Sequence, residues 1–201
     1  MKDFNLPEMK NIKIKGKKEE QEELARIIKK VLPKFPEYIK EKLEKFPIVF
    51  FVRERPRGLL KPDGKFIDVD GVTVFNEEKR QIEIVIRRAC LSHSDEEAKE
   101  RLVAEELLHV YVAQDNWESG ITFDVAGLDE CDVRDLLQVC GFKIPDEEIR
   151  ACISGYIEAG ITSKKELLKA MGMEGFLDEE RVRRLIDEEL ENRKKSFRFL
   201  S

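Results

Sequence analysis

The chain has 201 residues, a net charge of −5 and a hydrophobic fraction of 41%, which is enough for one domain with a core, with or without a small appendage. No apolar run approaches the roughly 20 residues that a membrane helix needs, and no secretory signal is visible, so the composition predicts a cytoplasmic protein without membrane contact. The charged fraction of 39%, dominated by lysine and glutamate, is typical of thermophile proteins with surface ion-pair networks.

The N-terminal third of the chain predicts two helices. Residues 1–17 are polar and lysine-rich and form either a loose arm or a first strand. Apolar side chains within residues 18–32 fall on one helical stripe, and a shorter helix is expected over 38–46. Pro33 and Pro36 separate the two, because proline interrupts a helix.

Strand-like runs follow. β-Branched and aromatic residues predict strands over 48–52, 72–75 and 82–86, the last two joined by a turn as an antiparallel hairpin. Proline and glycine within residues 55–64 predict turns between the first two strands.

Helical spacing dominates the rest of the chain. Ser94-Asp95-Glu96-Glu97 matches a capping box, with Ser92 or Ser94 as the expected N-cap, and the helical pattern continues to Gln114. After a loop over 115–127, we expect further helices over residues 128–139, 145–159, 164–171 and 178–195.

These elements predict an α+β fold. A small, mostly antiparallel sheet and the long helix would form one domain over residues 1–143. A helical extension would follow over residues 144–201.

The long helix contains the run Ala104-Glu105-Glu106-Leu107-Leu108-His109. Residues four apart lie one above the other on a helix, so Glu105 and His109 can point at one metal ion, with Glu106 beside them. Apolar residues on most sides of this helix predict burial on several faces. Charged side chains in such a helix are costly unless they are paired or bind a metal, so the spacing indicates either an ordinary helix with paired charges or a metal site.

The charge distribution favours a cation at this site. Residues 91–148 hold 4 basic and 16 acidic side chains, a net charge of −12. A strongly negative cleft attracts cations and basic partners and repels nucleic-acid phosphates.

The run is one residue away from H-E-x-x-H, the zinc-protease helix motif, with Glu105 at the position of the first histidine. With the preceding hairpin over residues 71–84 and the acidic helix that follows, it resembles the zincin metallopeptidase core, of the gluzincin type, over residues 45–140. The resemblance implies that Glu106 is the general base. It also implies an extended peptide or protein substrate that pairs with the edge strand. Tyr111, Tyr156 or a positively charged side chain would stabilise the oxyanion.

The third metal ligand is implied only by the resemblance. Gluzincins use a carboxylate on the helix after the motif helix, and here Glu130, 21 residues after His109, is the first choice, with Asp129 and Asp132 as alternatives. Glu105, His109 and Glu130 would offer one nitrogen and two carboxylates. Such a set binds zinc less tightly than two histidines do, or favours manganese or iron.

The replaced histidine leaves a second function open. A zincin-like protein without a motif histidine is also what a pseudoenzyme looks like, with no metal at all. The alternative is a non-catalytic binding or regulatory protein that uses the same fold. A ferritin-like di-iron site would need a second Glu-x-x-His, and His93, the other histidine, has no glutamate three residues before it.

The C-terminal helices carry a separate hypothesis. Residues 162–172 and 178–186 resemble a helix-turn-helix that contacts protein or DNA. DNA is disfavoured, because the second helix would begin with Asp178-Glu179-Glu180 and present negative charge to phosphates.

Overall fold

The computed structural model describes residues 4–6, 9–60, 66–118, 130–170 and 179–198, and side chains within 10–56, 69–113, 133–170 and 179–193. The chain divides into two units, Met1–Phe142 and Lys143–Ser201. The boundary expected after residue 143 lies one residue from this division.

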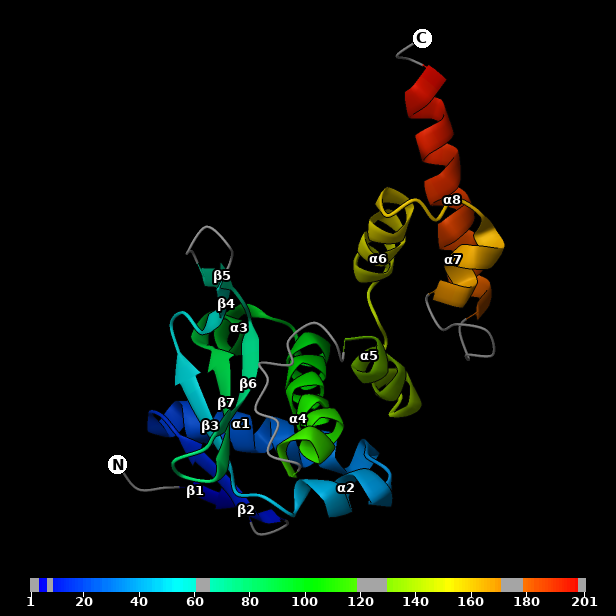
Figure 1. Ribbon diagram of the computed structural model, residues 1–201. Coiled ribbons are helices and arrows are strands. Elements are labelled where there is room, and N and C mark those ends of the chain that lie inside the picture. The colour runs from blue at the N-terminus through cyan, green and yellow to red at the C-terminus, as the bar shows by residue number, and fades with distance from the viewer. Residues whose placement is uncertain (1–3, 7–8, 61–65, 119–129, 171–178, 199–201) are drawn as a thin grey trace. The chain divides into compact units, whose positions relative to one another are not determined.

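The first unit holds all the described strands and six of the helical segments (Figure 1). In chain order they are β1 (Phe4–Leu6), β2 (Met9–Lys15), α1 (Lys18–Val31), η1 (Leu32–Lys34), α2 (Glu37–Leu43), β3 (Ile48–Arg53), β4 (Arg57–Leu60), β5 (Phe66–Asp68), β6 (Gly71–Asn76), β7 (Gln81–Arg87), α3 (Arg88–His93), α4 (Glu96–Glu118) and α5 (Glu130–Val139). The second unit holds α6 (Asp146–Glu158), α7 (Lys164–Ala170) and α8 (Glu179–Arg198).

The main sheet has five strands in the order β1-β2-β3-β7-β6. The expected hairpin is confirmed, because β6 and β7 pair antiparallel from Gly71 opposite Ile86 to Asn76 opposite Gln81. The expectation of a mostly antiparallel sheet is corrected: β2–β3 and β3–β7 are parallel, and β1–β2 and β6–β7 are antiparallel. The helices α1 and α2 return the chain so that β3 runs in the same direction as β2, as a parallel crossover requires. The α+β class stands, with a mixed sheet.

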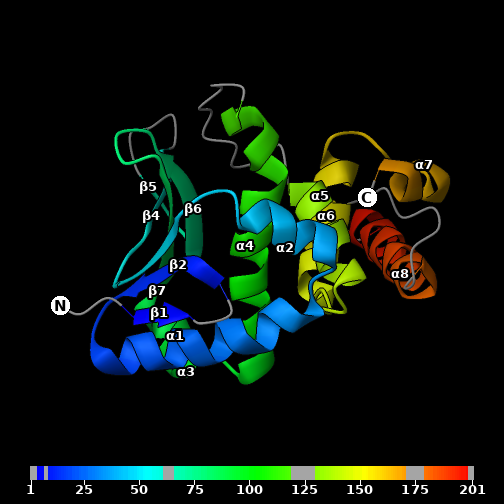
Figure 2. The same ribbon diagram turned by 90° about the horizontal axis from the view of Figure 1, so that it is seen from below.

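Helices α1 and α4 pack on one face of this sheet (Figure 2). Alternate residues of three strands point into this layer and are fully buried: Ile12, Ile14, Ile48, Phe50, Ile82, Ile84 and Ile86. Each such side chain contributes about 1.5–3 kcal/mol through burial. The period of two along β2, hidden within a lysine-rich segment, explains why residues 9–15 form a strand and not a loose arm.

The two prolines act as expected. Helix α1 ends at Val31, two residues before Pro33, and α2 begins directly after Pro36. At the other end of α2, the Asn11 side-chain amide donates to the main-chain oxygens of Leu43 and Phe46 at 2.7 and 2.8 Å. These bonds satisfy carbonyls that a helix end leaves without partners and tie α2 to β2.

Two short strands, β4 and β5, were not expected from the sequence. Strands β4 and β5 pair antiparallel, with Arg57 opposite Asp68 and Leu60 opposite Phe66. Strand β4 lies within the stretch where proline and glycine predicted only turns, and β5 follows it closely. Helix α3 was also not expected.

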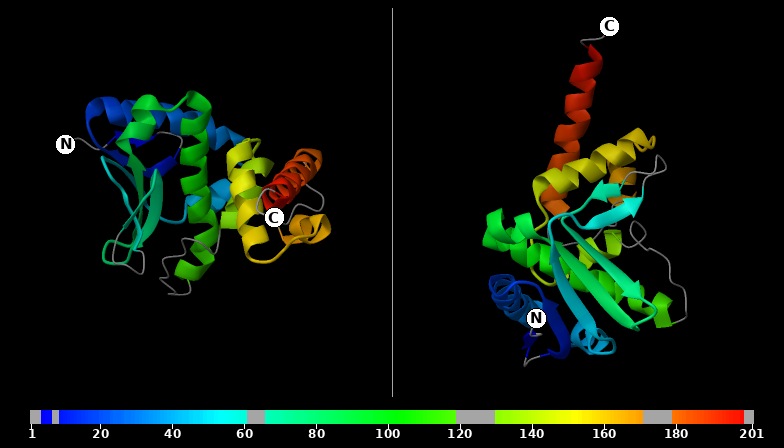
Figure 3. Two further views of the ribbon diagram at one scale, coloured as in Figure 1. Left: turned by 90° about the horizontal axis from the view of Figure 1, so that it is seen from above. Right: turned by 90° about the vertical axis from the view of Figure 1, so that its left-hand side faces the viewer.

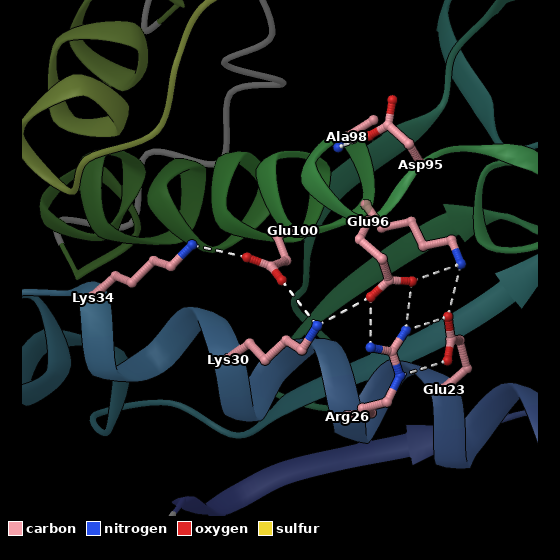
Figure 4. A network of polar contacts seen from close by, with 9 residues as sticks. Glu23, Arg26, Lys30, Lys34, Asp95, Glu96, Ala98 and Glu100 are labelled. Atoms are coloured by element: carbon pink, nitrogen blue, oxygen red, sulfur yellow. Dashed lines mark hydrogen bonds and ion pairs between the residues drawn. The ribbon is translucent and has the colours of Figure 1, made fainter.

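An ion-pair network joins α1 and η1 to the first turns of α4 (Figure 4). Arg26 Nη1 lies 2.5 Å from Glu96 Oε2, Lys30 Nζ lies 3.2 Å from Glu100 Oε1, and Lys99 Nζ lies 2.8 Å from Glu23 Oε1. Its members are Glu23, Arg26, Lys30, Lys34, Glu96, Lys99 and Glu100. Hydrogen bonds from Arg26 lower the pKa of Glu96 and of Glu23, and a bond from Lys34 lowers the pKa of Glu100.

This network gives a testable dependence of stability on pH. The folded state holds these carboxyl groups at lower pKa values than the unfolded chain does, so it binds fewer protons. The free energy of unfolding therefore decreases as the pH is lowered. The stabilisation is complete above the unfolded glutamate pKa of about 4.3 and is lost as the pH falls through the folded values. Urea midpoints at successive pH values measure this loss.

Glu96→Gln should flatten that acid dependence, because it removes the carboxylate shared by Arg26 and Lys30. Glu97→Gln is the matched control, since Glu97 is exposed and lies outside the network. The same acid dependence in Glu96→Gln and the unchanged protein would refute the assignment.

The second unit is a helical unit with its own core. Its buried residues are Ile144, Ile149, Ile153, Ile157, Leu167, Leu168, Val182, Leu185 and Ile186. Ser163 caps α7 by accepting a hydrogen bond from the Glu166 amide at 3.2 Å. No helix in the described part of either unit is long and apolar enough to cross a membrane.

Candidate metal centre

The motif run lies in the middle of α4. The helix begins one residue later than a Ser94 cap would require, because Asp95 Oδ1 accepts the Ala98 amide at 2.7 Å and acts as the N-cap. Glu96 and Glu97 fill the first turn, where carboxylates interact favourably with the helix dipole. The helix continues to Glu118 and so includes the first four residues of the expected loop.

The expectation that α4 is buried on several sides is confirmed. Val103, Ala104, Leu107, Leu108 and Val110 are each at most 1% exposed. The helix packs against α1, α2, α5 and the strands β6 and β7. Its motif residues therefore lie inside the first unit and not on a free helix.

Glu105 and His109 lie one turn apart on the same side of α4 and are both half-buried. Neither is without a polar or electrostatic partner. Their donor atoms, a carboxylate oxygen and an imidazole nitrogen, are of the types that zinc, manganese and iron accept. By chemistry and spacing the pair fits two positions of a metal site.

Glu106 is the most buried charged residue in the described part of the chain, with 4% of its surface exposed. Thr73 Oγ1 on β6 lies 2.6 Å from its carboxylate oxygen Oε2 and 3.0 Å from its main-chain oxygen. The hydroxyl has one proton, and the shorter contact identifies Oε2 as its acceptor. This bond offsets part of the cost of burying a carboxylate.

Gly71 completes the seat of this carboxylate. A Cβ atom at residue 71 would lie 2.3 Å from Glu106 Oε1 and 2.8 Å from Cδ, so only glycine leaves room for the side chain. Gly71 and Thr73 share one face of β6, two residues apart. Sequence reasoning missed both; the available signal was a glycine at the first residue of the hairpin that precedes the motif helix.

The third ligand cannot be placed among the described side chains. Glu130 is the first residue of α5, which packs against α4, but its side chain and that of Asp132 lie outside the described residues, as does Asp129. Within the described side chains, no three or more His, Cys, Asp or Glu residues gather to hold a metal ion. Glu105 and His109 thus lie one turn apart on α4, and α5, which begins with Glu130, packs against this helix.

Other candidate residues lie elsewhere. His93 is exposed at the end of α3. The Tyr111 ring packs edge-on against Tyr38 of α2 at 6.0 Å, and Lys42 Nζ lies 4.6 Å from its centre, so Tyr111 faces α2. Tyr156 belongs to the second unit.

Three of the four cysteines lie among the described side chains. Cys90, Cys140 and Cys152 form no disulfide among the described residues, and Cys131 lies outside the described side chains. Burial raises the pKa of Cys90 and of Cys140 to about 11, so neither supplies thiolate near neutral pH.

No family model matches the sequence, and neither a curated protein nor a solved structure matches the chain.

Proposed function

We propose that this protein is a zincin-like metallopeptidase relative that binds a divalent metal ion through Glu105, His109 and a carboxylate of α5, with Glu130 as the first choice. One observation carries the proposal. Glu106 is seated by Thr73 and Gly71 on the antiparallel edge strand β6, while Glu105 and His109 lie together beside it on α4. A candidate base, two candidate ligands and a strand edge are thus adjacent.

Each part of the proposed site would have its own role in peptide hydrolysis. A bound metal ion would polarise a scissile carbonyl and lower the pKa of its water. Thr73 donates to Oε2 of Glu106 and so fixes the orientation of the carboxylate that would accept a proton. The edge of β6 away from β7 would pair with an extended peptide through main-chain hydrogen bonds.

Metal content tests the proposal. Protein purified in buffer supplemented with zinc or manganese should retain about one equivalent of metal per chain, as counted by mass spectrometry, and His109→Ala should lose it because the imidazole donor is gone. Absence of bound metal at near-physiological zinc and manganese would refute the metal site and peptidase activity together.

Glu106→Gln separates binding from catalysis. The amide keeps the size of the side chain but cannot take a proton, so metal content should stay the same while hydrolysis of a casein substrate falls by about 100-fold or more. Equal hydrolysis by the variant and the unchanged protein would remove Glu106 from the mechanism. Metal binding without hydrolysis in the unchanged protein would identify a pseudoenzyme.

The second candidate is a non-catalytic binding protein, favoured by Glu105 at the position of a histidine and by the separate helical unit. DNA is a poor partner for that unit. Three of its arginines are already paired with carboxylates, namely Arg150 with Glu188, Arg181 with Asp146 and Arg183 with Glu179. Eight residues separate α7 from α8, more than the three or four of a helix-turn-helix turn. Duplex DNA binding by the full chain that falls steeply with salt would overturn this preference for a protein partner.

A further inference from the structure

The face of the main sheet opposite α1 and α4 has an unusual composition. Figure 3 (right) shows the strands in front of α4 from this side. Side chains alternate along each strand, so two neighbouring cross-sheet rows lie on this face. One row consists of Lys15, Phe51, Val85 and Val72. The other consists of Lys13, Val49, Glu83 and Val74. Arg53 follows Phe51 on the same face of β3. We call Lys13, Lys15, Phe51 and Arg53 the basic sheet patch.

The patch centres on an aromatic ring between cations. Lys15 Nζ lies 5.6 Å and Arg53 Cζ 5.8 Å from the centre of the Phe51 ring. Lys13 and Arg53 are exposed, and Lys15 and Phe51 are half-buried. The ring and the cations are therefore reachable at the same surface.

The cations of the patch are not neutralised within the described residues. Lys13, Lys15 and Arg53 have no carboxylate partner there, whereas arginines elsewhere in the first unit, such as Arg26 and Arg88, are bound to glutamates. Glu83 shares this face, but its Oε1 already accepts from Asn76, Lys79 and Gln81. Within the described part of the chain, the positive charge of the patch is therefore not offset by a paired carboxylate.

The charge distribution of the chain points the same way. Residues 1–90, which supply the sheet, hold 22 basic and 16 acidic side chains, while residues 91–148 carry a net charge of −12. A polyanion is attracted to the sheet and repelled from α4.

We propose that the basic sheet patch binds single-stranded nucleic acid, with a base stacked on Phe51 and phosphates at Lys13, Lys15 and Arg53. A single strand fits better than a duplex, because its unstacked bases can lie on a ring that stands on a sheet surface. It fits better than an acidic peptide, since carboxylates use the cations but gain nothing from the ring. The patch is independent of the metal site.

Fluorescence anisotropy with labelled oligothymidylate and oligouridylate tests the proposal on the full chain. Each phosphate contact contributes a slope of about −0.7 in log affinity against log salt, so three cations predict a slope of about −2. Lys13→Glu/Lys15→Glu should weaken binding tenfold or more and bring the slope to about −0.7. Phe51→Leu should weaken binding about fivefold or more at unchanged slope, because it removes stacking but keeps the charges.

The matched control is Lys165→Glu/Lys169→Glu, which makes the same charge change at exposed lysines of α7. It should leave binding unchanged, and circular dichroism should show that all three variants keep their helix and strand content. Equal loss in the control and in Lys13→Glu/Lys15→Glu overturns the proposal, as does binding that polyglutamate or anionic vesicles compete away as well as unlabelled oligonucleotide does. Absence of binding at low salt overturns it as well.

Discussion

Glu105→His is expected to increase the affinity of the protein for zinc by on the order of 100-fold. The substitution restores the two-histidine helix motif, placing imidazole nitrogens one turn apart on α4, and imidazole is a better zinc ligand than a lone carboxylate in this position. Changes outside the first ligand shell typically alter metal affinity by about 10–100-fold, so a change of ligand is expected to reach at least the upper end of that range. Competition with a chromogenic chelator measures the affinity.

Two further variants make this result specific. Glu105→Gln removes the charged donor without adding an imidazole and should bind zinc more weakly than the unchanged protein. Glu105→His/His109→Ala has an imidazole at position 105 but none at position 109, so its zinc affinity should not rise as it does in Glu105→His. Zinc affinity in Glu105→His that is no higher than in the unchanged protein would show that residue 105 does not face a metal site.

Gly71→Ala destabilises the fold by about 1–3 kcal/mol, the usual cost of forcing an extra methyl into a packed site. The new Cβ would lie 2.3 Å from Oε1, 2.8 Å from Cδ and 2.9 Å from Cγ of Glu106, so the buried carboxylate or the edge strand must move. Urea unfolding measures the loss, and the metal content of the variant shows whether the disturbance reaches Glu105 and His109.

A double-mutant cycle assigns the cost to this contact. In a Glu106→Ala background the obstructing carboxylate is absent, so Gly71→Ala should cost less than about 0.5 kcal/mol. Gly155→Ala is the control, because Gly155 lies within α6 with nothing within 4 Å of an added Cβ, and alanine there should stabilise the helix by up to about 1 kcal/mol. The same cost with and without the Glu106 side chain would place the origin of the strain elsewhere.

Local pattern was sufficient for most elements. Helices α1, α2, α4 and α6 were expected within a few residues of their ends, because their apolar stripes and the prolines and glycine beside them act over a few residues only. The hairpin β6–β7 was expected for the same reason, since its strands are joined by a short turn. Strand β2 was left open against a loose arm, because its lysines obscured the alternation of Ile12 and Ile14.

The pairing of strands that lie far apart in the sequence could not be predicted from local sequence patterns. The parallel centre of the sheet joins Ile12 to Ile48 and Ile48 to Ile82, and nothing local to any of these strands states its neighbour or direction. The same limit applies to the seat of Glu106. Gly71 and Thr73 lie more than thirty residues before it, and only the packing of α4 on β6 brings them together.

The sequence by itself determined that one long helix carries Glu105, Glu106 and His109 after a hairpin, because helical spacing and hairpin turns are set by neighbouring residues. The tertiary structure decided which of those side chains meets which strand. It places the Glu106 side chain against Gly71 and Thr73 and leaves Glu105 and His109 half-buried one turn apart. It also places Lys13, Lys15, Phe51 and Arg53 on the far face of the sheet. These positions depend on non-local packing. The apolar side chains buried between the sheet and α4 fix how the helix lies on the sheet, and this determines which polar side chains meet.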